Sequence, residues 1–382
     1  MGEWKEQKLN DLVSINQRSI DKHYPHKIIE YLDTGSVTRG KIESFEYVEI
    51  EKAPSRAKRL VSKGDIIIST VRPIQRHYAI MNSVNPNTVV STGFAVITCK
   101  DTINPYFLYY YLTQDEITNY LDIVAEGSTT AYPSITPNVI SELDIPLPPL
   151  PEQQSIASVL SSLDDKIDLL TRQNKTLEAL AETLFRQWFV EGAEEGWETG
   201  KLGDEFDFTM GQSPPGSSFN EDGNGIIFFQ GRTDFGFRFP DARVYTTEPK
   251  RYAKKFETLV SVRAPVGDMN LAIEDCCLGR GVAAFRYKHN STYHTYTYYK
   301  MKSLMAQIKQ FEDNGTVFGS IGKDDFKKLE NTIPPKELIK KFKAEASPLD
   351  EKIFKNTIQI RTLSRLRDML LPKLMSGEIR VY

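Results

Sequence analysis

Lysine and arginine side chains gather in two stretches of the sequence, and these residue types contact nucleic-acid phosphates and read base edges. Residues 51–100 carry eight Lys or Arg against two Asp or Glu, and residues 231–310 carry fourteen against seven. Residues 151–210, between them, carry thirteen Asp or Glu against five Lys or Arg. Two basic stretches separated by an acidic one predict two DNA-binding surfaces, although the formal net charge of the chain is only −3.

The candidate DNA-binding residues lie within these two basic stretches. In the first stretch they are Arg56, Lys58, Arg59, Lys63, Arg72, Arg76, His77 and Tyr78. In the second stretch they are Arg232, Arg238, Arg243, Lys250, Arg251, Lys254, Arg263 and Arg280. Arg72 and Arg263 each follow a β-rich run in a shared Val-Arg pair, so a structural role at a strand end is an equal alternative for both. A solvated charged face is the alternative for either stretch taken alone.

The patterns that carry enzyme chemistry are absent from the sequence. It has no GxxxxGK[ST] loop for nucleotide phosphates, no GxGxxG fingerprint and no NPPY-type segment to hold a flipped base. His23 and His26 have no Cys or acidic partners at metal-ligand spacing. Asp164–Asp165 and Asp350–Glu351 recur at the same place in the two halves of the chain, so we expect them on solvent-facing helix positions. The sequence therefore predicts a chain with no catalytic residues and no metal site.

Composition favours a globular protein in a reducing compartment. Apolar residues make up 40% and charged residues 26% of the 382 residues, which suits two or three folded domains. No run approaches the ~18–20 apolar residues that span a bilayer, and the first residues lack the apolar region of a secretory signal. Three cysteines, an odd number, support neither a disulfide framework nor a zinc site. We therefore expect a cytoplasmic protein with no membrane contact.

The chain is an internal repeat of a unit of about 190 residues. The offset between matching segments stays near half the chain length throughout. The matching segments are STVRP (69–73) with SVRAP (261–265), GFAVI (93–97) with GVAAF (281–285), FLYYYL (107–112) with YTYYKM (296–301), TAYPSI (130–135) with TVFGSI (316–321), and SLDDKI (162–167) with PLDEKI (348–353).

Each copy of the repeat divides into a β-rich part and a long helix. Short apolar runs bounded by Gly and Pro, such as GDIIISTV at 64–71, predict a small twisted sheet or barrel. A short helix is expected to start at Asn104–Pro105, with proline at its first position. We expect four segments along the chain: a first mixed domain at 1–150, a central helix at 151–191, a second mixed domain at 192–335, and a C-terminal helix and tail at 336–382.

The two long helices each carry an apolar seam with heptad spacing, which predicts that they pack on each other as a coiled coil. The first seam runs through Ile156, Leu160, Leu163, Ile167, Leu170, Asn174, Leu177, Ala181, Leu184 and Trp188. The second runs through Phe342, Ala346, Leu349, Ile353, Asn356, Ile360, Leu363, Arg367, Leu370 and Leu374. Ser347–Pro348 falls inside the second seam, where we expect a kink or a restart of the helix.

Each seam contains one asparagine, Asn174 or Asn356. In an antiparallel pair the numbers of facing residues have a constant sum, and opposing the two asparagines sets that sum at 530. Leu163 then faces Arg367, whose stem must extend outward. An amide buried alone among aliphatic side chains costs roughly a few kcal/mol, whereas two facing amides satisfy each other. We therefore expect the Asn174–Asn356 pair to fix the register of the helices.

Several segments together resemble the specificity subunit of type I restriction–modification systems. The resemblance covers nearly the whole chain, and its most specific part is the block from PLPPLPEQ to LFRQWFV. The segments that carry it are SRAKRLVSKGDIIISTVRP (55–73), AYPSI (131–135), IPLPPLPEQQSIASVLSSLDDKIDLL (145–170), LFRQWFV (184–190) and LLPKLMSGEI (370–379).

The resemblance implies an α+β fold in which two pseudo-repeated small mixed α/β target-recognition domains are joined by two long helices forming an antiparallel coiled coil. Each domain would read one half of a split site in double-stranded DNA. The chain itself would bind no cofactor: separate modification subunits would methylate DNA with S-adenosylmethionine, and restriction subunits would cleave it with ATP and Mg²⁺. The modification subunits would dock on the helical regions, although KELIKKFK at 336–343 departs from the LPEQQSIA pattern of the first copy.

Two functions of other classes remain as alternatives. One is a self-contained enzyme, such as a fused nuclease or methyltransferase, against which the missing motifs count. The other is a coiled-coil scaffold with protein-binding globular ends and no DNA specificity. Binding to random duplex DNA that weakens steeply with salt would argue against the scaffold.

Overall fold

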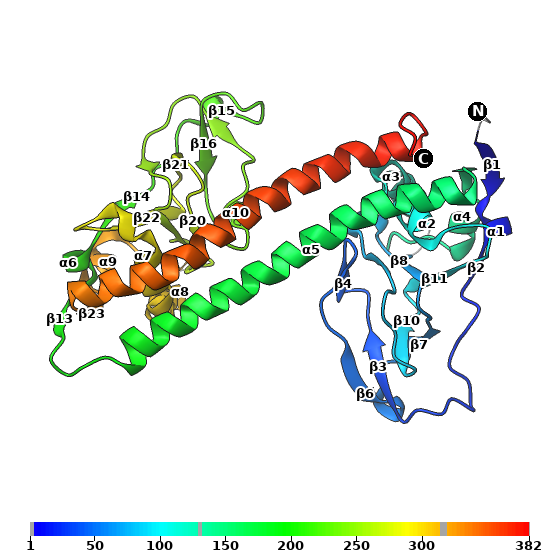
Figure 1. Ribbon diagram of the computed structural model, residues 1–382, viewed down its shortest axis with the longest axis horizontal. Coiled ribbons are helices and arrows are strands. Elements are labelled where there is room, and N and C mark those ends of the chain that lie inside the picture. The colour runs from blue at the N-terminus through cyan, green and yellow to red at the C-terminus, as the bar shows by residue number, and fades with distance from the viewer. Residues whose placement is uncertain (1–3, 129–131, 314–318, 382) are drawn as a thin grey trace. The chain divides into compact units, whose positions relative to one another are not determined.

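The structure is a computed structural model, and it describes residues 4–128, 132–313 and 319–381 (Figure 1). The chain forms two compact units, one of residues 1–170 with 358–382 and one of residues 171–357. Each unit holds one mixed α/β domain and a portion of each long helix. The matching segments TAYPSI and TVFGSI lie partly in residues 129–131 and 314–318, which are outside the described residues.

The first unit is built from short strands and short helices. Its strands are β1 (Lys5–Lys8), β2 (Val13–Ile15), β3 (Ile28–Leu32), β4 (Val37–Thr38), β5 (Lys41–Ile42), β6 (Glu46–Glu49), β7 (Ala57–Leu60), β8 (Ile66–Ser69), β9 (Tyr78–Ile80), β10 (Thr88–Ser91), β11 (Phe94–Cys99) and β12 (Asp144–Leu147). Its short helices are α1 (Leu9–Leu12), η1 (Ile50–Lys52), η2 (Pro73–Gln75), α2 (Pro105–Leu112), α3 (Asp115–Glu126) and α4 (Pro137–Ser141).

The second unit has a matching set of elements. Its strands are β13 (Glu198–Lys201), β14 (Phe206–Met210), β15 (Phe219–Asn220), β16 (Ile226–Phe229), β17 (Tyr245–Thr246), β18 (Tyr252–Ala253), β19 (Thr258–Ser261), β20 (Met269–Leu271), β21 (Cys276–Leu278), β22 (Val282–Tyr287) and β23 (Glu330–Ile333). Its short helices are α6 (Leu202–Glu205), η4 (Gly216–Ser218), η5 (Arg232–Asp234), η6 (Ser291–Tyr293), α7 (His294–Ser303), α8 (Met305–Asp313) and α9 (Lys323–Lys328).

The two units pair their strands in the same order, as a duplicated sequence requires. The sheet β2-β11-β8-β9 of the first unit corresponds to β14-β22-β19-β20 of the second. The sheet β6-β3-β10-β7 corresponds to β17-β16-β21-β18, with β15 added at the edge of the second copy. In both of these sheets the two central strands, β3 with β10 and β16 with β21, are parallel. The antiparallel pair β1-β12, formed by the two ends of the first mixed domain, likewise corresponds to β13-β23.

Strand β8 carries three consecutive apolar residues, Ile66–Ile68, because it lies between two cores. Ile66 and Ile68 of β8 face a core shared with α2 and α3, whereas Ile67 faces a second core beneath the other sheet. Side chains alternate between the two faces of a strand, so a strand covered on both faces reads as an unbroken apolar run. The second unit repeats this arrangement, with Val260 in one core and Leu259 in the other.

Helix α2 begins at the predicted residue. The Asn104 side chain accepts hydrogen bonds from the backbone N–H groups of Tyr106 (3.0 Å) and Phe107 (3.1 Å), and Pro105 occupies the first helical position. This cap satisfies N–H groups that the first turn of a helix leaves without partners. The prediction of a helix starting at Asn104–Pro105 is therefore confirmed.

The long helices are α5 (Leu150–Arg186), which continues through a π-helical turn η3 (Gln187–Glu191), and α10 (Lys336–Met375). Every residue of the two predicted seams is buried or half-buried. Trp188 lies against Phe342 in the second unit, with ring centroids 6.2 Å apart. In the first unit, Arg367 donates a hydrogen bond to Asp164. The residue numbers of these two contacts sum to 530 and 531, and a nearly constant sum is what an antiparallel pair requires. Figure 1 shows the two helices packed together.

Pro348 does not divide the second helix. α10 runs without a break from Lys336 to Met375, so the expected restart at Ser347–Pro348 is wrong. Proline removes one backbone N–H donor from the helix ladder. Ala346 and Ile353 on either side of it are fully buried, and this packing holds the helix together across the missing bond.

Candidate nucleic-acid interface

Three basic side chains of the first unit project into solvent. Arg56 precedes the edge strand β7, Lys58 lies on it, and Lys63 occupies the turn before β8. All three are exposed, and their charged groups have no hydrogen-bond or ion-pair partner among the described residues. Exposed, unpaired cations are available to phosphate oxygens, so these three form the part of the first predicted cluster best suited to contact DNA.

Arg59, Arg76, His77 and Tyr78 are already engaged within the unit. Arg76 Nη1 donates to Asp115 Oδ1 at 2.6 Å, and this hydrogen bond raises the pKa of Arg76. His77 Nδ1 lies 2.5 Å from the carbonyl oxygen of Val37, and the Tyr78 ring packs on another tyrosine. Arg59 is half-buried, and burial lowers the pKa of its guanidinium. The structure therefore gives these four residues internal partners or surroundings that the sequence pattern did not predict.

The turn η2 joins β8 to β9 in an unusual backbone conformation. Arg72 and Arg76, which flank the turn, both have left-handed backbone angles, with φ of 47° and 58°. Such values are rare for residues other than glycine and often mark functional loops. Ile74 N donates to Asp122 Oδ1 of α3 (3.2 Å), which fixes the turn while Arg72, Ile74 and Gln75 remain exposed.

Arg39 is a residue of this loop region that the sequence analysis missed. It lies between β4 and β5 with φ of 47°, and its N–H donates to the carbonyl oxygen of Arg76 at 2.8 Å. The side chain of Arg39 is exposed. The Arg39–Gly40 step is a turn signal in the sequence, but only the fold brings it beside Arg76.

Arg72 and Arg263 are not equivalent residues in the two units. Ser134 forms a β-bridge with Val71 in the first unit, and Ser320 forms the matching bridge with Arg263 in the second. The structural counterpart of Arg263 is therefore Val71, one residue before Arg72. Arg72 instead stacks over the Tyr132 ring, 5.4 Å from its centroid. The shared Val-Arg pair in the sequence thus conceals a one-residue shift between the copies.

The basic residues of the second unit also divide into free and paired groups. Lys250, Arg251, Arg263 and Arg280 are exposed, and their side chains have no hydrogen-bond or ion-pair partner in the described part of the chain. Three others form surface ion pairs: Arg232 with Asp268 (3.0 Å), Arg243 with Asp234 (3.0 Å) and Lys254 with Asp275 (2.7 Å).

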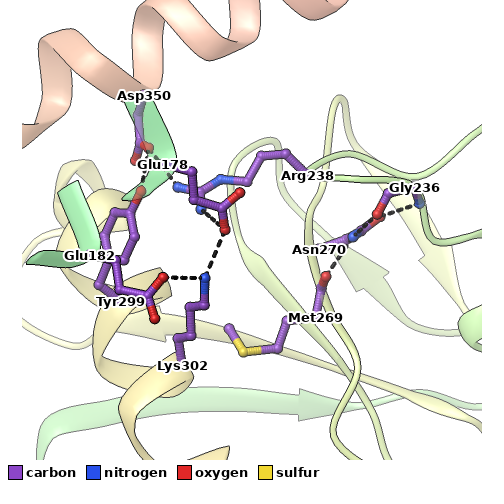
Figure 2. A network of polar contacts seen from close by, with 9 residues as sticks. All are labelled: Glu178, Glu182, Gly236, Arg238, Met269, Asn270, Tyr299, Lys302 and Asp350. Carbon is purple, nitrogen blue, oxygen red and sulfur yellow. Dashed lines mark hydrogen bonds and ion pairs between the residues drawn. The ribbon is translucent and has the colours of Figure 1, made fainter. Parts of the chain in front are cut away.

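Arg238 does not belong to the surface at all. It is 1% exposed, and its Nη2 donates to Asp350 Oδ1 at 2.6 Å (Figure 2). Asp350 is itself 5% exposed, so its predicted solvent-facing position is wrong. A buried guanidinium paired with a carboxylate is not available to a phosphate. We therefore remove Arg238 from the predicted DNA-binding set.

The two seam asparagines lie opposite each other in the second unit. Asn356 Nδ2 donates to Asn174 Oδ1 at 2.9 Å, and Asn174 Nδ2 donates to Thr357 Oγ1 at 3.5 Å. Asn174 is 3% exposed and Asn356 is 1% exposed. Each buried amide thus finds a polar partner in an otherwise apolar seam.

The described residues offer no set of side chains for catalysis or for a metal. Across residues 4–128, 132–313 and 319–381, no three His, Cys, Asp or Glu side chains are grouped so that they could hold a metal ion. Cys276 and Cys277 are both buried in β21, and burial raises the pKa of the Cys276 thiol, which disfavours a reactive thiolate.

Comparison with known proteins covers both units. Residues 1–179 and 194–359 match the family described as type I restriction modification DNA specificity domain. The type I restriction enzyme HindI specificity subunit of Haemophilus influenzae is 26% identical, over 99% of this chain and 100% of that protein. The MjaIX specificity subunit of Methanocaldococcus jannaschii is 27% identical, over 99% of this chain and 94% of that protein. The type I restriction–modification S subunit from M. genitalium has the same fold, with a TM-score of 0.63 at 18% identity over 97% of this chain and 96% of that chain.

The chain belongs to the specificity subunits of type I restriction–modification systems. Such a subunit is non-catalytic and directs target recognition within the complex. The predicted α+β fold, with two domains joined by a pair of long helices, is confirmed. None of the helices in the described residues is long and apolar enough to cross a membrane.

Proposed function

We propose that the chain reads a bipartite target in double-stranded DNA, one half with each mixed domain. The observation that carries this proposal is the repetition of one strand-pairing order in two units whose exposed basic residues differ. A shared scaffold with different surface side chains suits the reading of two different half-sites. The working segments are a first recognition domain at 1–150, a spacer helix at 151–191, a second recognition domain at 192–335, and a second spacer helix with its tail at 336–382.

Within the first recognition domain, two surfaces have different roles. Arg56, Lys58 and Lys63 contact phosphates, which positions the domain without reading sequence. The strained turn η2 presents Arg72, Ile74 and Gln75, and Arg and Gln side chains form the paired hydrogen bonds that distinguish guanine and adenine edges. In the second domain Lys250, Arg251, Arg263 and Arg280 are the exposed basic residues that meet DNA.

The chemistry on DNA belongs to partner subunits in this proposal. Type I modification subunits methylate the target with S-adenosylmethionine, and restriction subunits cleave with ATP and Mg²⁺. The modification subunits dock on the helical regions, and the complex works in the cytoplasm, where it reaches DNA. The described residues of this chain supply DNA recognition and the spacing between half-sites.

A domain exchange tests the bipartite model. Residues 1–150 are replaced by the matching segment of a relative with a different target, and the complex with modification subunits is used to methylate genomic DNA. Sequencing of methylated sites should show a change in one half-site only. A change in both half-sites would contradict separate reading by the two domains. If the isolated chain binds no duplex DNA at any salt concentration, the coiled-coil scaffold becomes the better model.

A further inference from the structure

The two units attach their domains to the long helices through equivalent aspartates with different arginine partners. Asp164 of α5 and Asp350 of α10 occupy the same position in the repeated segments SLDDKI and PLDEKI. Tyr110 of α2 and Tyr299 of α7 are likewise equivalent, and each donates its hydroxyl to the aspartate of its own unit, at 2.7 Å and 3.4 Å. A Tyr–Asp contact between domain and helix is therefore common to both copies.

The arginine that completes each contact comes from a different place. In the first unit Arg367 of α10 donates to Asp164 Oδ1 at 2.7 Å, so the ion pair joins one long helix to the other. In the second unit Arg238 donates to Asp350, and Arg238 lies in the loop after η5, within the mixed domain. The Asp164–Arg367 pair is about one-third exposed, whereas the Arg238 side chain is fully buried.

Arg238 contacts both long helices from this loop. Its Nη1 lies 3.7 Å from Glu178 Oε1 of α5, and its guanidinium carbon lies 3.3 Å from the centroid of the Tyr298 ring. Lys302 of α7 bonds the same Glu178 oxygen at 2.9 Å and Glu182 at 2.8 Å (Figure 2). Because the pair is buried, the attraction between its charges is strong and the loss of either partner is costly.

The backbone of the loop is held equally firmly on the sheet side. The Asn270 side chain of β20 accepts from the N–H of Gly236 (3.0 Å) and donates to its carbonyl oxygen (2.9 Å). Leu271 N donates to the carbonyl oxygen of Arg238 at 2.8 Å. The loop is thus fixed to the recognition sheet by its backbone. It is fixed to α5 and α10 by the Arg238 side chain, and beside it the Phe239 ring packs against Phe354 of α10, with centroids 5.5 Å apart.

We propose that Arg238 is a positioning residue that holds the sheet of the second recognition domain in one orientation on the spacer helices. In the described residues of the first unit, the equivalent aspartate is paired with a helix residue, Arg367, and not with an arginine of a loop. This inference rests on the proposed bipartite reading. It adds that the accepted gap between half-sites depends on Arg238, although Arg238 does not touch DNA.

The test compares gap-length preference in the complex with modification subunits. Methylation rates are measured on duplexes with the natural gap and with gaps one base pair shorter and longer. In Arg238→Met with Asp350→Leu, apolar side chains replace both charges, which avoids an unpaired buried charge. The rate ratio between natural and altered gaps should fall about tenfold, whereas a simple loss of stability would lower all rates and leave the ratio unchanged. Arg238→Lys retains one charge contact and should give an intermediate ratio.

The matched control is Arg367→Met with Asp164→Leu, which removes the equivalent aspartate pair of the first unit and should leave the ratio unchanged. An unchanged ratio in folded Arg238→Lys or in the Arg238–Asp350 double variant overturns the inference, as does an equal fall in the control. If the unmodified complex shows no gap preference at all, the bipartite model itself fails, and the two failures are distinguishable.

Discussion

At the scale of single residues, the neighbours of each basic side chain decide its role. Arg56 and Arg76 are both arginines of the first basic stretch. Arg56 is exposed and has no partner in the part of the chain that the structure describes, whereas Arg76 is bonded to Asp115. A phosphate that binds Arg76 must first displace a carboxylate, whereas one that binds Arg56 displaces only water and counterions. Phosphate contacts release counterions and therefore appear in the salt dependence of DNA binding.

Replacing Arg56, Lys58 and Lys63 together by alanine should reduce the log–log slope of DNA affinity against salt by up to about 2.7, at about 0.9 for each lost contact. Arg76→Ala is the matched control and should leave the slope unchanged, because its charge is already neutralised by Asp115. Affinity is measured by fluorescence anisotropy from about 50 to 200 mM salt, the range over which phosphate contacts change affinity strongly. An unchanged slope in the triple variant would assign the cluster to a solvated face.

At the scale of elements, the spacer helices combine an apolar seam with one polar layer. Asn174 and Asn356 are buried and bonded to each other, so a shift of the helices by one heptad would oppose each amide to an aliphatic side chain. Burying an unsatisfied amide is more costly than losing an apolar contact of similar size. We infer that this layer selects one register from the several that the apolar seam permits.

Asn174→Leu alone should destabilise the chain by about 1–3 kcal/mol, because it leaves the Asn356 amide buried without its partner. Asn174→Leu with Asn356→Leu should recover most of this loss, since two apolar residues then face each other. Thermal unfolding measures both changes. Thr357→Val serves as a control that leaves the asparagine pair in place and removes the 3.5 Å bond from Asn174 and the 2.8 Å bond from Thr357 Oγ1 to the carbonyl oxygen of Ile353. If the stability lost by the double variant equals the sum of the losses of Asn174→Leu and Asn356→Leu measured separately, the asparagines do not act as a pair.

At the scale of the whole molecule, each unit has its own cores, and each includes part of both long helices. Ile156 and Leu374 belong to a core of the first unit, while Phe185 and Phe342 belong to a core of the second. The boundary between the units therefore crosses both helices near their middle, between Leu170 and Thr171 in α5. A defect in one core should act first on the unit that contains it.

Phe342→Ala should cost about 3–5 kcal/mol, because this fully buried ring packs against Phe185, Trp188 and Phe189. Hydrogen exchange followed by mass spectrometry should show faster exchange mainly in residues 171–357. Leu160→Ala is the mirror experiment in the first unit and should act mainly on residues 1–170 and 358–382. Equal acceleration in both units would indicate a single cooperative structure.

The sequence predicts the regular features of this fold because they repeat or follow a period. Duplication, the short apolar runs within β8 and β11, the helix cap at Asn104 and the opposition of Asn174 to Asn356 all follow from sequence pattern or spacing. The burial of Arg238 and Asp350 could not be predicted, because the sequence does not distinguish a charged residue buried in an ion pair from one exposed to solvent. The one-residue shift between Arg72 and Arg263 was hidden for a similar reason: strand pairing, not residue similarity, determines which positions correspond.

The buried Arg238–Asp350 pair also limits which domains can be exchanged by recombination. Asp350 lies on the spacer helix and stays with the recipient, whereas Arg238 lies in the recognition domain and leaves with it. A donor domain without a positively charged residue at this position would leave the Asp350 carboxylate buried in the hybrid without an ion-pair partner. The first domain carries no such requirement, because Arg367 and Asp164 both remain on the helices. New specificities should therefore be acquired more readily by shuffling the first domain than the second.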